Sequence, residues 1–287
     1  MSAGLCLDSG SRWLSLLRTL PVGLRGKSHL ARFALSRWLD KKDVRIIDRF
    51  GFRYTVPSLR EPIGFYLLVD GVYEGGLVRL VTSQLGLGGV FLDVGANIGT
   101  FTIPAATAVG PQGVVLAVEA SPRIHHYLAT NIELNQCANV IQEQCVASDH
   151  SGTCEFYEAP VEKFGMGSVG PQFGVAPLAL RAATLDSLAE QHHLERVDVI
   201  KVDVEGYEAA VFRGAQNVLR APNPPLIAFE FCDWAEERIP GARIGDAQRV
   251  LGEAGYQMWR LSDYGRGRAP LNGLLTSGFE TIVAKKV

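Results

Sequence analysis

Apolar runs of five to seven residues recur from residue 90 onward, and stretches of helical spacing separate them. Short apolar runs bounded by glycine, proline or polar residues are typical of buried strands. They predict strands over Val90–Val94, Val114–Val118, Val140–Val146, Val197–Val202 and Leu226–Phe231. The stretches between them predict helices over Phe101–Val109, Pro122–Asn135, Thr184–His193 and Glu208–Leu219. This alternation favours an α/β fold, a parallel sheet with helices on both faces.

The regions on either side of this pattern are less regular. Near the start, Val44–Val56 predicts a hairpin that turns at Arg49–Gly51, and Gly75–Leu85 predicts a helix. Near the end, Tyr256–Leu261 and Thr281–Ala284 predict two further strands with an antiparallel edge. We expect two parts: residues 1–88 as a basic helical and hairpin extension, and residues 89–287 as a ligand-binding domain.

Two long segments rich in glycine and proline interrupt the regular pattern, at Pro160–Leu180 and at Ser262–Gly278. A long irregular segment inside a compact domain is usually either a ligand-covering loop or a tether. Both segments are therefore candidates to cover the mouth of a binding site.

The composition, 47% hydrophobic and 20% charged, is that of an ordinary globular protein. The five cysteines form no C-x-x-C pair, which favours reduced thiols in a cytoplasmic protein. No apolar run approaches the roughly 20 residues of a membrane-spanning helix. Arg18 and Arg25 interrupt the early apolar region, so we expect no signal peptide.

Charge is distributed unevenly along the chain. Residues 1–60 carry 12 basic and 4 acidic side chains, whereas the remainder carries 16 basic and 26 acidic ones. From Ser9 to Leu39 the chain has no acidic residue, and arginines recur among apolar side chains. Two interpretations fit: a helical cap packed on the acidic domain, or a peripheral contact with an anionic membrane or carrier. A sequence pI near 6.3 and the lack of a nucleic-acid-binding motif argue against a nucleic-acid partner.

The most informative stretch runs from Phe91 to Thr100, where an apolar run ends at an acid and enters a glycine turn. Its G-x-x-x-G spacing differs from the dinucleotide fingerprint, and no lysine follows the second glycine, which disfavours a phosphate-binding loop. An acid two places before the first glycine suits a ligand that carries an ammonium group, such as S-adenosylmethionine. We therefore predict cofactor contacts from Asp93, Gly95, Asn97, Gly99 and Thr100.

The next predicted strand ends at Glu119, twenty-four positions after Gly95. In nucleotide-binding α/β sheets an acid at this point accepts hydrogen bonds from the ribose hydroxyls. A carboxylate offers acceptors to both donors of a cis diol. We assign Glu119 and the adjacent Ala120 to the cofactor site.

The fourth predicted strand carries three ionisable residues, Lys201, Asp203 and Glu205, which an extended strand would place on one face. Charged groups within an apolar strand are costly unless they line a site. The carboxyl edge of an open α/β sheet is also where such folds bind ligands. We take all three as catalytic candidates, with Asp203 also a candidate for the cofactor's ammonium; a salt-bridged strand end is the alternative.

Taken together, these motifs resemble the FkbM-type methyltransferases. The resemblance covers roughly residues 89–231 and rests on the order and spacing of Asp93–Gly99, Glu119 with Asn131 and Asn135, Thr184–Asp186, Lys201–Glu208 and Glu230. It implies a class I methyltransferase (Rossmann-like) fold, a seven-stranded, mostly parallel sheet with a reversed last strand. It also implies S-adenosylmethionine as cofactor and O-methyl transfer to a hydroxyl of a sugar or natural product.

Some positions depart from the family pattern or extend it. The family commonly has proline after the ribose-binding glutamate, where this chain has Ala120. Tyr73 and Glu74 resemble an element found before the core in this family, and with Glu230 they are substrate-side candidates. No Asp-Asp or Asp-Asn pair follows near the fifth strand, so we predict no metal.

An alcohol is a poor nucleophile at neutral pH, so a general base within hydrogen-bond reach would assist methyl transfer. Asp203 and Glu205 are the candidates, whereas the His125–His126 pair is expected on the surface. Two other functions stay open: an NAD(P)-dependent oxidoreductase on a Rossmann sheet, and a binding module without catalysis. The acceptor and the oligomeric state are not determined by the sequence.

Overall fold

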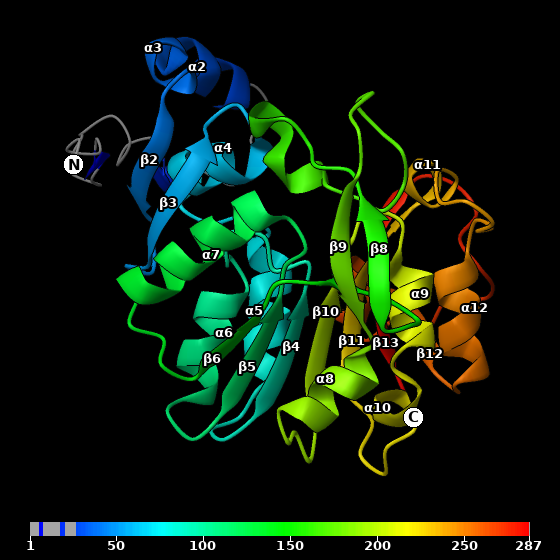
Figure 1. The fold of residues 1–287 in the computed structure, drawn as a ribbon. Coiled ribbons are helices and arrows are strands. Elements are labelled where there is room, and N and C mark those ends of the chain that lie inside the picture. The colour runs from blue at the N-terminus through cyan, green and yellow to red at the C-terminus, as the bar shows by residue number, and fades with distance from the viewer. Residues whose placement is uncertain (1–5, 8–17, 21–26, 287) are drawn as a thin grey trace.

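The computed structural model describes residues 6–7, 18–20 and 27–286 (Figure 1). Residues 9–17 and 21–26 of the basic segment 9–39 therefore lie outside the described residues. Within the described residues, no helix is long and apolar enough to cross a membrane.

A seven-stranded sheet forms the centre of the molecule, in the order β12-β13-β11-β10-β4-β5-β6. Strand β13 is antiparallel to both of its neighbours, β11 and β12, and the other pairings in this sheet are parallel. The fold is therefore the predicted α/β class, with the reversed strand next to the edge. The strands are β4 (Val90–Val94), β5 (Val114–Val118), β6 (Val140–Glu143), β10 (Val199–Val202), β11 (Leu226–Cys232), β12 (Gln257–Arg260) and β13 (Phe279–Lys285).

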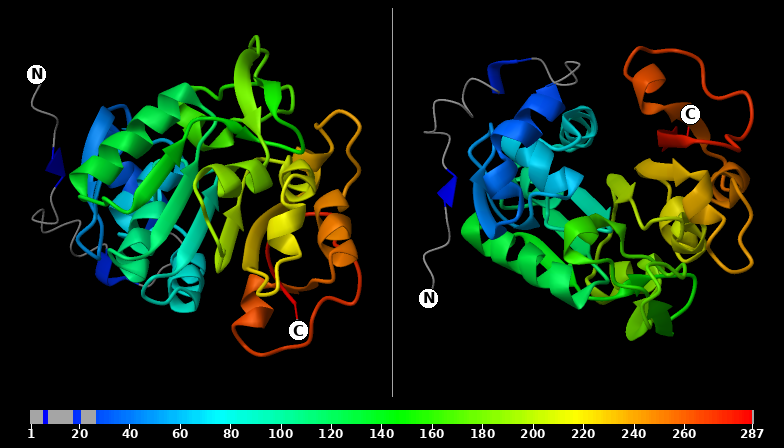
Figure 2. Two further views of the ribbon diagram at one scale, coloured as in Figure 1. Left: turned by 60° about the horizontal axis from the view of Figure 1, so that its bottom comes forward. Right: turned by 90° about the horizontal axis from the view of Figure 1, so that it is seen from above.

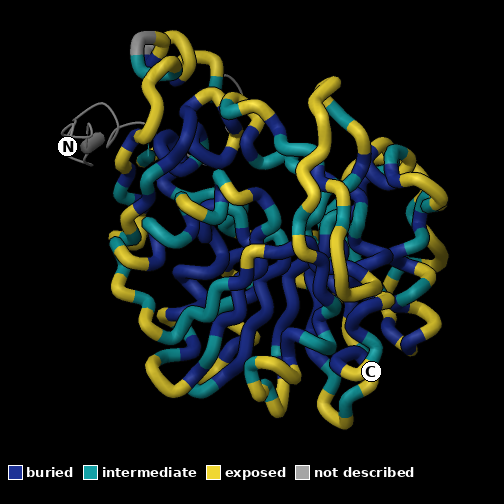
Figure 3. The backbone as a smooth tube through the Cα atoms, viewed as in Figure 1, coloured by how far each residue is buried: buried dark blue, intermediate teal, exposed yellow. Residues whose placement is uncertain are grey.

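Helices cover both faces of this sheet because its strands are apolar on both sides. One layer comprises α5 (Gly75–Gln84), α6 (Thr102–Val109) and α7 (Pro122–Leu134), which pack on alternate strand residues such as Phe91, Val115 and Val199. The other layer includes α8 (Leu185–Gln191), α9 (Glu208–Arg213), α10 (Gln216–Leu219) and α12 (Asp246–Glu253), packed on Leu92, Leu116 and Ile200. Figure 3 shows the buried strands between the exposed outer turns.

Two predicted elements are each divided in the structure. The strand predicted over Val140–Val146 ends at Glu143, and β7 (Val146–Ala147) belongs to a separate sheet with β8 (Gly152–Phe156) and β9 (Leu178–Ala183). The helix predicted over Glu208–Leu219 breaks into α9 and α10 at Gly214. A Cβ atom on Gly214 would lie 2.0 Å from the Ser148 carbonyl oxygen, so a segment distant in sequence occupies the space there.

The N-terminal elements form a smaller layer beside the sheet (Figure 2). The predicted hairpin is present as β2 (Lys42–Ile47) and β3 (Arg53–Ser58), accompanied by β1 (Cys6–Leu7), α2 (Lys27–Ala34), α3 (Ser36–Leu39) and α4 (Pro62–Val69). Asn131 on α7 joins this layer to the sheet domain. Its side chain accepts a hydrogen bond from Thr55 N at 2.7 Å and donates one to Ile98 O at 2.9 Å.

Two cations of the basic segment take part in this packing. Arg18 donates to the carbonyls of Ile47, Leu67 and Leu68. Lys27 is buried and lies 2.5 Å from Asp70. At these two positions the segment packs against the N-terminal layer, and its interpretation as a cap on the acidic domain stays a prediction. The domain boundary at residue 89 and the membrane contact stay predictions.

We predict that Gly214→Ala destabilises the protein by about 1–3 kcal/mol, because the added methyl group has no room beside Ser148 O. Gly252→Ala is the matched control, since its Cβ atom meets nothing closer than Met258 Cε at 4.0 Å. Alanine within helix α12 should raise stability by about 0.5–1 kcal/mol. Thermal unfolding measures both variants, and equal midpoints would contradict the prediction.

Candidate active site

The glycine turn after β4 brings the ends of three strands together. Gly95 has φ +74°, and the N–H groups of Gly95 and Ala96 both donate to the Val118 carbonyl at the end of β5. A Cβ atom on Gly95 would lie 1.8 Å from the Asp203 carbonyl oxygen, beyond β10. Only glycine permits this approach, which places Asp203 directly against the turn.

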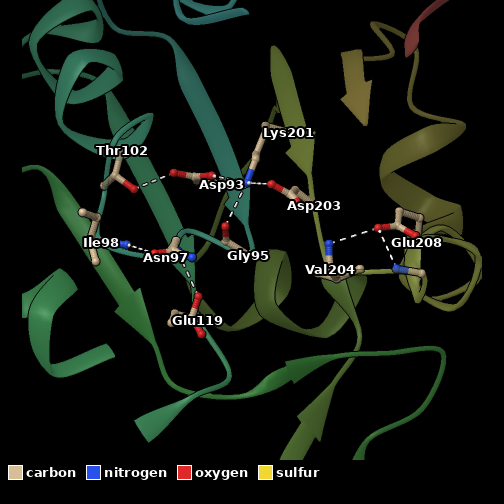
Figure 4. Close-up of polar contacts among 11 residues, drawn as sticks. Asp93, Gly95, Asn97, Ile98, Thr102, Glu119, Lys201, Asp203, Val204 and Glu208 are labelled. Carbon is tan, nitrogen blue, oxygen red and sulfur yellow. Dashed lines mark hydrogen bonds and ion pairs between the residues drawn. The ribbon is translucent and has the colours of Figure 1, made fainter. Parts of the chain in front are cut away.

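The buried ammonium of Lys201 connects the end of β10 to β4 and the turn that follows it (Figure 4). Its Nζ donates to Gly95 O at 2.8 Å and lies 3.4 Å from Asp203 Oδ2 and 3.8 Å from Asp93 Oδ1. Burial by itself lowers the pKa of Lys201, but the carboxylates of Asp203 and Asp93 outweigh it and raise the pKa. Lys201 therefore stays charged and holds the turn, and its catalytic role stays a prediction.

Asp93 lies beneath the turn and has no exposed surface. Its Oδ2 accepts a hydrogen bond from Thr102 Oγ1 at 2.5 Å, while Oδ1 faces Lys201. It lines neither of the cavities described below. This arrangement differs from the expectation that Asp93 meets the cofactor's ammonium directly: its carboxylate supports Lys201, and Asp203 is the acid that reaches the cavities.

Glu119 closes one end of a narrow cavity at the carboxyl edge of the sheet. Its two oxygens accept hydrogen bonds from the N–H groups of Asn97 and Ser121, both at 2.9 Å. Burial raises the pKa of Glu119 to about 7. Since each carboxylate oxygen has a second lone pair, the group can still accept from a diol. The cavity lining includes Gly95, Asn97, Glu119, Ala120, Val146, Phe156, Asp203 and Val204.

These residues fit S-adenosylmethionine in three respects. The side-chain-free turn at Gly95 lets a ligand approach the backbone. Glu119 presents acceptors of the kind that a ribose diol needs, and Val146 and Phe156 give apolar walls suited to an adenine ring. Asp203 offers a half-exposed carboxylate to an ammonium group.

A second, acidic cavity adjoins the first and shares Gly95, Asn97, Gly165 and Asp203 with it. Its lining also includes Glu61, Tyr73, Thr100, Lys201, Glu205 and Glu230. The chain thus brings together most of the predicted catalytic and substrate-side residues. We refer to this second space as the acidic cavity.

Three carboxylates of the acidic cavity lie very close together: an oxygen each from Asp203, Glu205 and Glu230 falls within 4.8 Å of the others. Burial, and then the negative charge of Asp203, raises the pKa of both Glu205 and Glu230. Sequence reasoning did not place Glu230 against Asp203, because the two residues lie on different strands. Such a group could hold a cation or share protons, so the predicted absence of a metal stays a prediction.

Glu205 reaches the acidic cavity by a turn and not by strand alternation. Strand β10 ends at Val202, and Glu205 has φ +55°. Glu208 holds this turn, since its Oε1 accepts from Val204 N at 3.0 Å and Gly206 N at 3.4 Å. Glu208 therefore fixes the backbone that carries Glu205.

Glu61 was missed by sequence reasoning. It is buried in the acidic cavity, and burial raises its pKa to about 7. It precedes Pro62 at the start of α4, in a region with no strand-end motif, so no local signal marked it. It comes from the N-terminal layer, which therefore supplies part of the site.

The lid predicted over Pro160–Leu180 does cover the cofactor cavity. Its short helix η1 (Val161–Met166) contributes Phe164 and Gly165 to the lining, and Ser168 Oγ donates to Glu205 O at 2.9 Å. The segment Ser262–Gly278, also predicted to cover a mouth, lines neither cavity.

The remaining predicted residues fall into two groups. Thr100 and Ala120 line the acidic and cofactor cavities respectively. Gly99, with φ +91°, lines neither, since a Cβ atom there would lie 3.1 Å from Leu128 Cδ1; it allows α7 to pack against the turn. Glu74 lines neither of these two cavities but a larger one described below, and His125 lines none of them.

Comparisons with known proteins agree with this geometry. The family model "Methyltransferase FkbM domain" matches residues 93–258, more than half of the chain. The hexuronic acid methyltransferase AglP of Haloferax volcanii is 28% identical over 72% of this chain and 79% of its own length. Methyltransferase sdnD of Sordaria araneosa is 29% identical over 44% of this chain, and the match spans 60% of that relative.

Solved structures show a loose overall likeness. An O-methyltransferase from Bacillus cereus in complex with SAH has a TM-score of 0.42 at 15% identity, with 94% of each chain covered. Aeropyrum pernix fibrillarin with bound S-adenosyl-L-methionine has a TM-score of 0.41 at 15% identity, with 84% and 92% covered. The family match does not favour a dinucleotide-dependent oxidoreductase. The chain belongs to the FkbM family of methyltransferases and is an S-adenosylmethionine-dependent enzyme.

Proposed function

We propose that this enzyme transfers a methyl group to a hydroxyl of a sugar or natural product held in the acidic cavity. The observation that carries the proposal is the direct junction of the two cavities at Gly95 and Asp203. The hexuronic acid methyltransferase AglP, a named relative, supports a sugar acceptor. Hydroxyl groups hydrogen-bond well to the carboxylates and the Tyr73 phenol that line the acidic cavity.

In this proposal the chain's own residues bind and orient the two substrates. Glu119 accepts from the ribose hydroxyls, Asp203 accepts from the methionyl ammonium, and the backbone at Gly95 permits close contact. When bound, S-adenosylmethionine supplies an activated methyl group, so catalysis depends mainly on orientation. Lys201 and Asp93 keep the turn and Asp203 in position.

Glu205 is our candidate for the general base that takes the acceptor's proton. It lines the acidic cavity, and its raised pKa makes it a stronger base than an ordinary carboxylate. Glu230 lies within the same group of oxygens and can hold a shared proton. A cytoplasmic location and the absence of a nucleic-acid partner stay predictions of the sequence.

The cofactor assignment predicts that Glu119→Ala weakens S-adenosylhomocysteine binding by at least about tenfold, since a carboxylate that accepts charge-assisted hydrogen bonds is lost. Isothermal titration calorimetry measures the dissociation constant. Glu155→Gln, an exposed change on β8, is the matched control. If Glu119→Ala binds as tightly as the parent, Glu119 does not hold the ribose.

The assignment of Glu205 as the general base predicts that turnover depends on pH. Because the base acts as a carboxylate and the pKa of Glu205 is raised to about 8, turnover should increase as the pH rises through that value. Glu205→Gln should lower turnover by about 10²–10⁴-fold and remove this acid limb. Steady-state rates from pH 6 to 10 test it, with Glu155→Gln as control. An unchanged pH profile in Glu205→Gln would assign the base to another residue.

Without a required metal, EDTA should leave turnover unchanged. Lys201 already neutralises Asp203, and a proton held by Glu230 relieves the remaining repulsion. The assay compares dialysed enzyme with and without EDTA, then with added Mg²⁺. Activity lost in EDTA and regained with Mg²⁺ would instead make the three carboxylates a metal site.

A further inference from the structure

A third and larger cavity lies outside the site described so far. It measures about 860 Å³, within the range of small-molecule sites. It lies between the N-terminal layer and the C-terminal strands, with Lys27, Arg49, Tyr66, Arg79, Leu261 and Phe279 in its lining. In the right-hand view of Figure 2 these blue and cyan elements face the orange and red ones. We refer to this space as the basic groove.

The basic groove has an excess of positive charge. Two acids line it: Asp70, which is buried and neutralised by Lys27 at 2.5 Å, and Glu74, which precedes helix α5. Arg49 and Arg79 are exposed, and among the described residues neither forms an ion pair with a carboxylate. His29 also lines the groove and is exposed. The available cations therefore exceed what the groove's own acids require.

Arg79 lies beside backbone that is open to a ligand. A Cβ atom on Gly75 would lie 3.6 Å from Arg79 Nη1, and one on Gly76 would meet nothing within 4 Å. These two glycines begin helix α5, whose preceding residue makes no side-chain capping hydrogen bond. Free N–H groups at a helix start add to the attraction that the arginines exert on an anion.

The basic groove and the acidic cavity are neighbours, because Tyr73 lines both. Charge reverses along this path, from Arg49 and Arg79 at one end to Glu205 and Glu230 at the other. A ligand that spans both spaces is therefore oriented by charge. An anionic portion is attracted to the groove and repelled from the carboxylates, and an uncharged polyol portion suits the acidic cavity.

We propose that the basic groove binds a phosphate or diphosphate group that links the acceptor sugar to its carrier, while the sugar hydroxyl reaches the acidic cavity past Tyr73. The inference rests on the proposed function and narrows its acceptor to a phosphate-linked one. Guanidinium groups bind phosphate through paired, charge-assisted hydrogen bonds. A methyl acceptor without a phosphate would not use the arginines of the groove in this way.

The test is calorimetric titration of the full-length protein, saturated with S-adenosylhomocysteine, with inorganic pyrophosphate. The parent should bind it, and Arg79→Gln should bind at least about tenfold more weakly. Arg220→Gln, an exposed arginine after α10 that lines no cavity described here, is the matched control and should bind like the parent. UDP and farnesyl diphosphate then distinguish a nucleoside carrier from an isoprenoid one: the natural carrier type should bind more tightly than pyrophosphate.

The outcomes separate this inference from the proposed function. If S-adenosylhomocysteine binds all three proteins equally but pyrophosphate does not bind, the inference is wrong and the cofactor site stands. Equal weakening in Arg79→Gln and Arg220→Gln would also overturn it, because general surface charge would then explain the binding. Absence of S-adenosylhomocysteine binding would instead contradict the cofactor assignment itself.

Discussion

The buried ammonium of Lys201 is the interaction on which the rest of the site depends. It joins the carbonyl of Gly95 to the carboxylates of Asp93 and Asp203, so one charge stabilises both strand ends. A buried lysine without such partners would be costly, and so would the buried carboxylate of Asp93 without the lysine. Because the turn at Gly95 touches the Asp203 backbone, this contact also fixes where the cofactor and acceptor spaces meet.

One lysine does not neutralise all of the acids at this edge of the sheet. Burial, and then the negative charge of Asp203, raises the pKa of Glu205 and Glu230, and burial raises the pKa of Glu61. Groups that take up protons near neutral pH are suited to receiving one from a hydroxyl. The same carboxylates repel an anion. The positive charge of the basic groove attracts one, so the two spaces together orient an acceptor that carries an anionic portion.

Much of the fold was predictable because its signals are local. Strands β4 and β5 have the predicted bounds, and the reversed strand β13 lies where the resemblance implied. The errors occur where distant segments meet. The break at Gly214 depends on the carbonyl of Ser148, and the end of β6 at Glu143 depends on a second sheet that β7 joins. The spacing of apolar residues along the chain predicts neither of these two contacts.

The sequence by itself determined the order of strands and helices, the glycine turn and the family, since spacing and glycine placement are properties of the chain. Only the tertiary structure decided which charges meet. It buried Asp93 beneath the turn, brought Glu230 beside Glu205 and added Glu61 from the N-terminal layer. Electrostatic interaction depends on distance and burial, and residues far apart in the chain acquire both only when the chain folds.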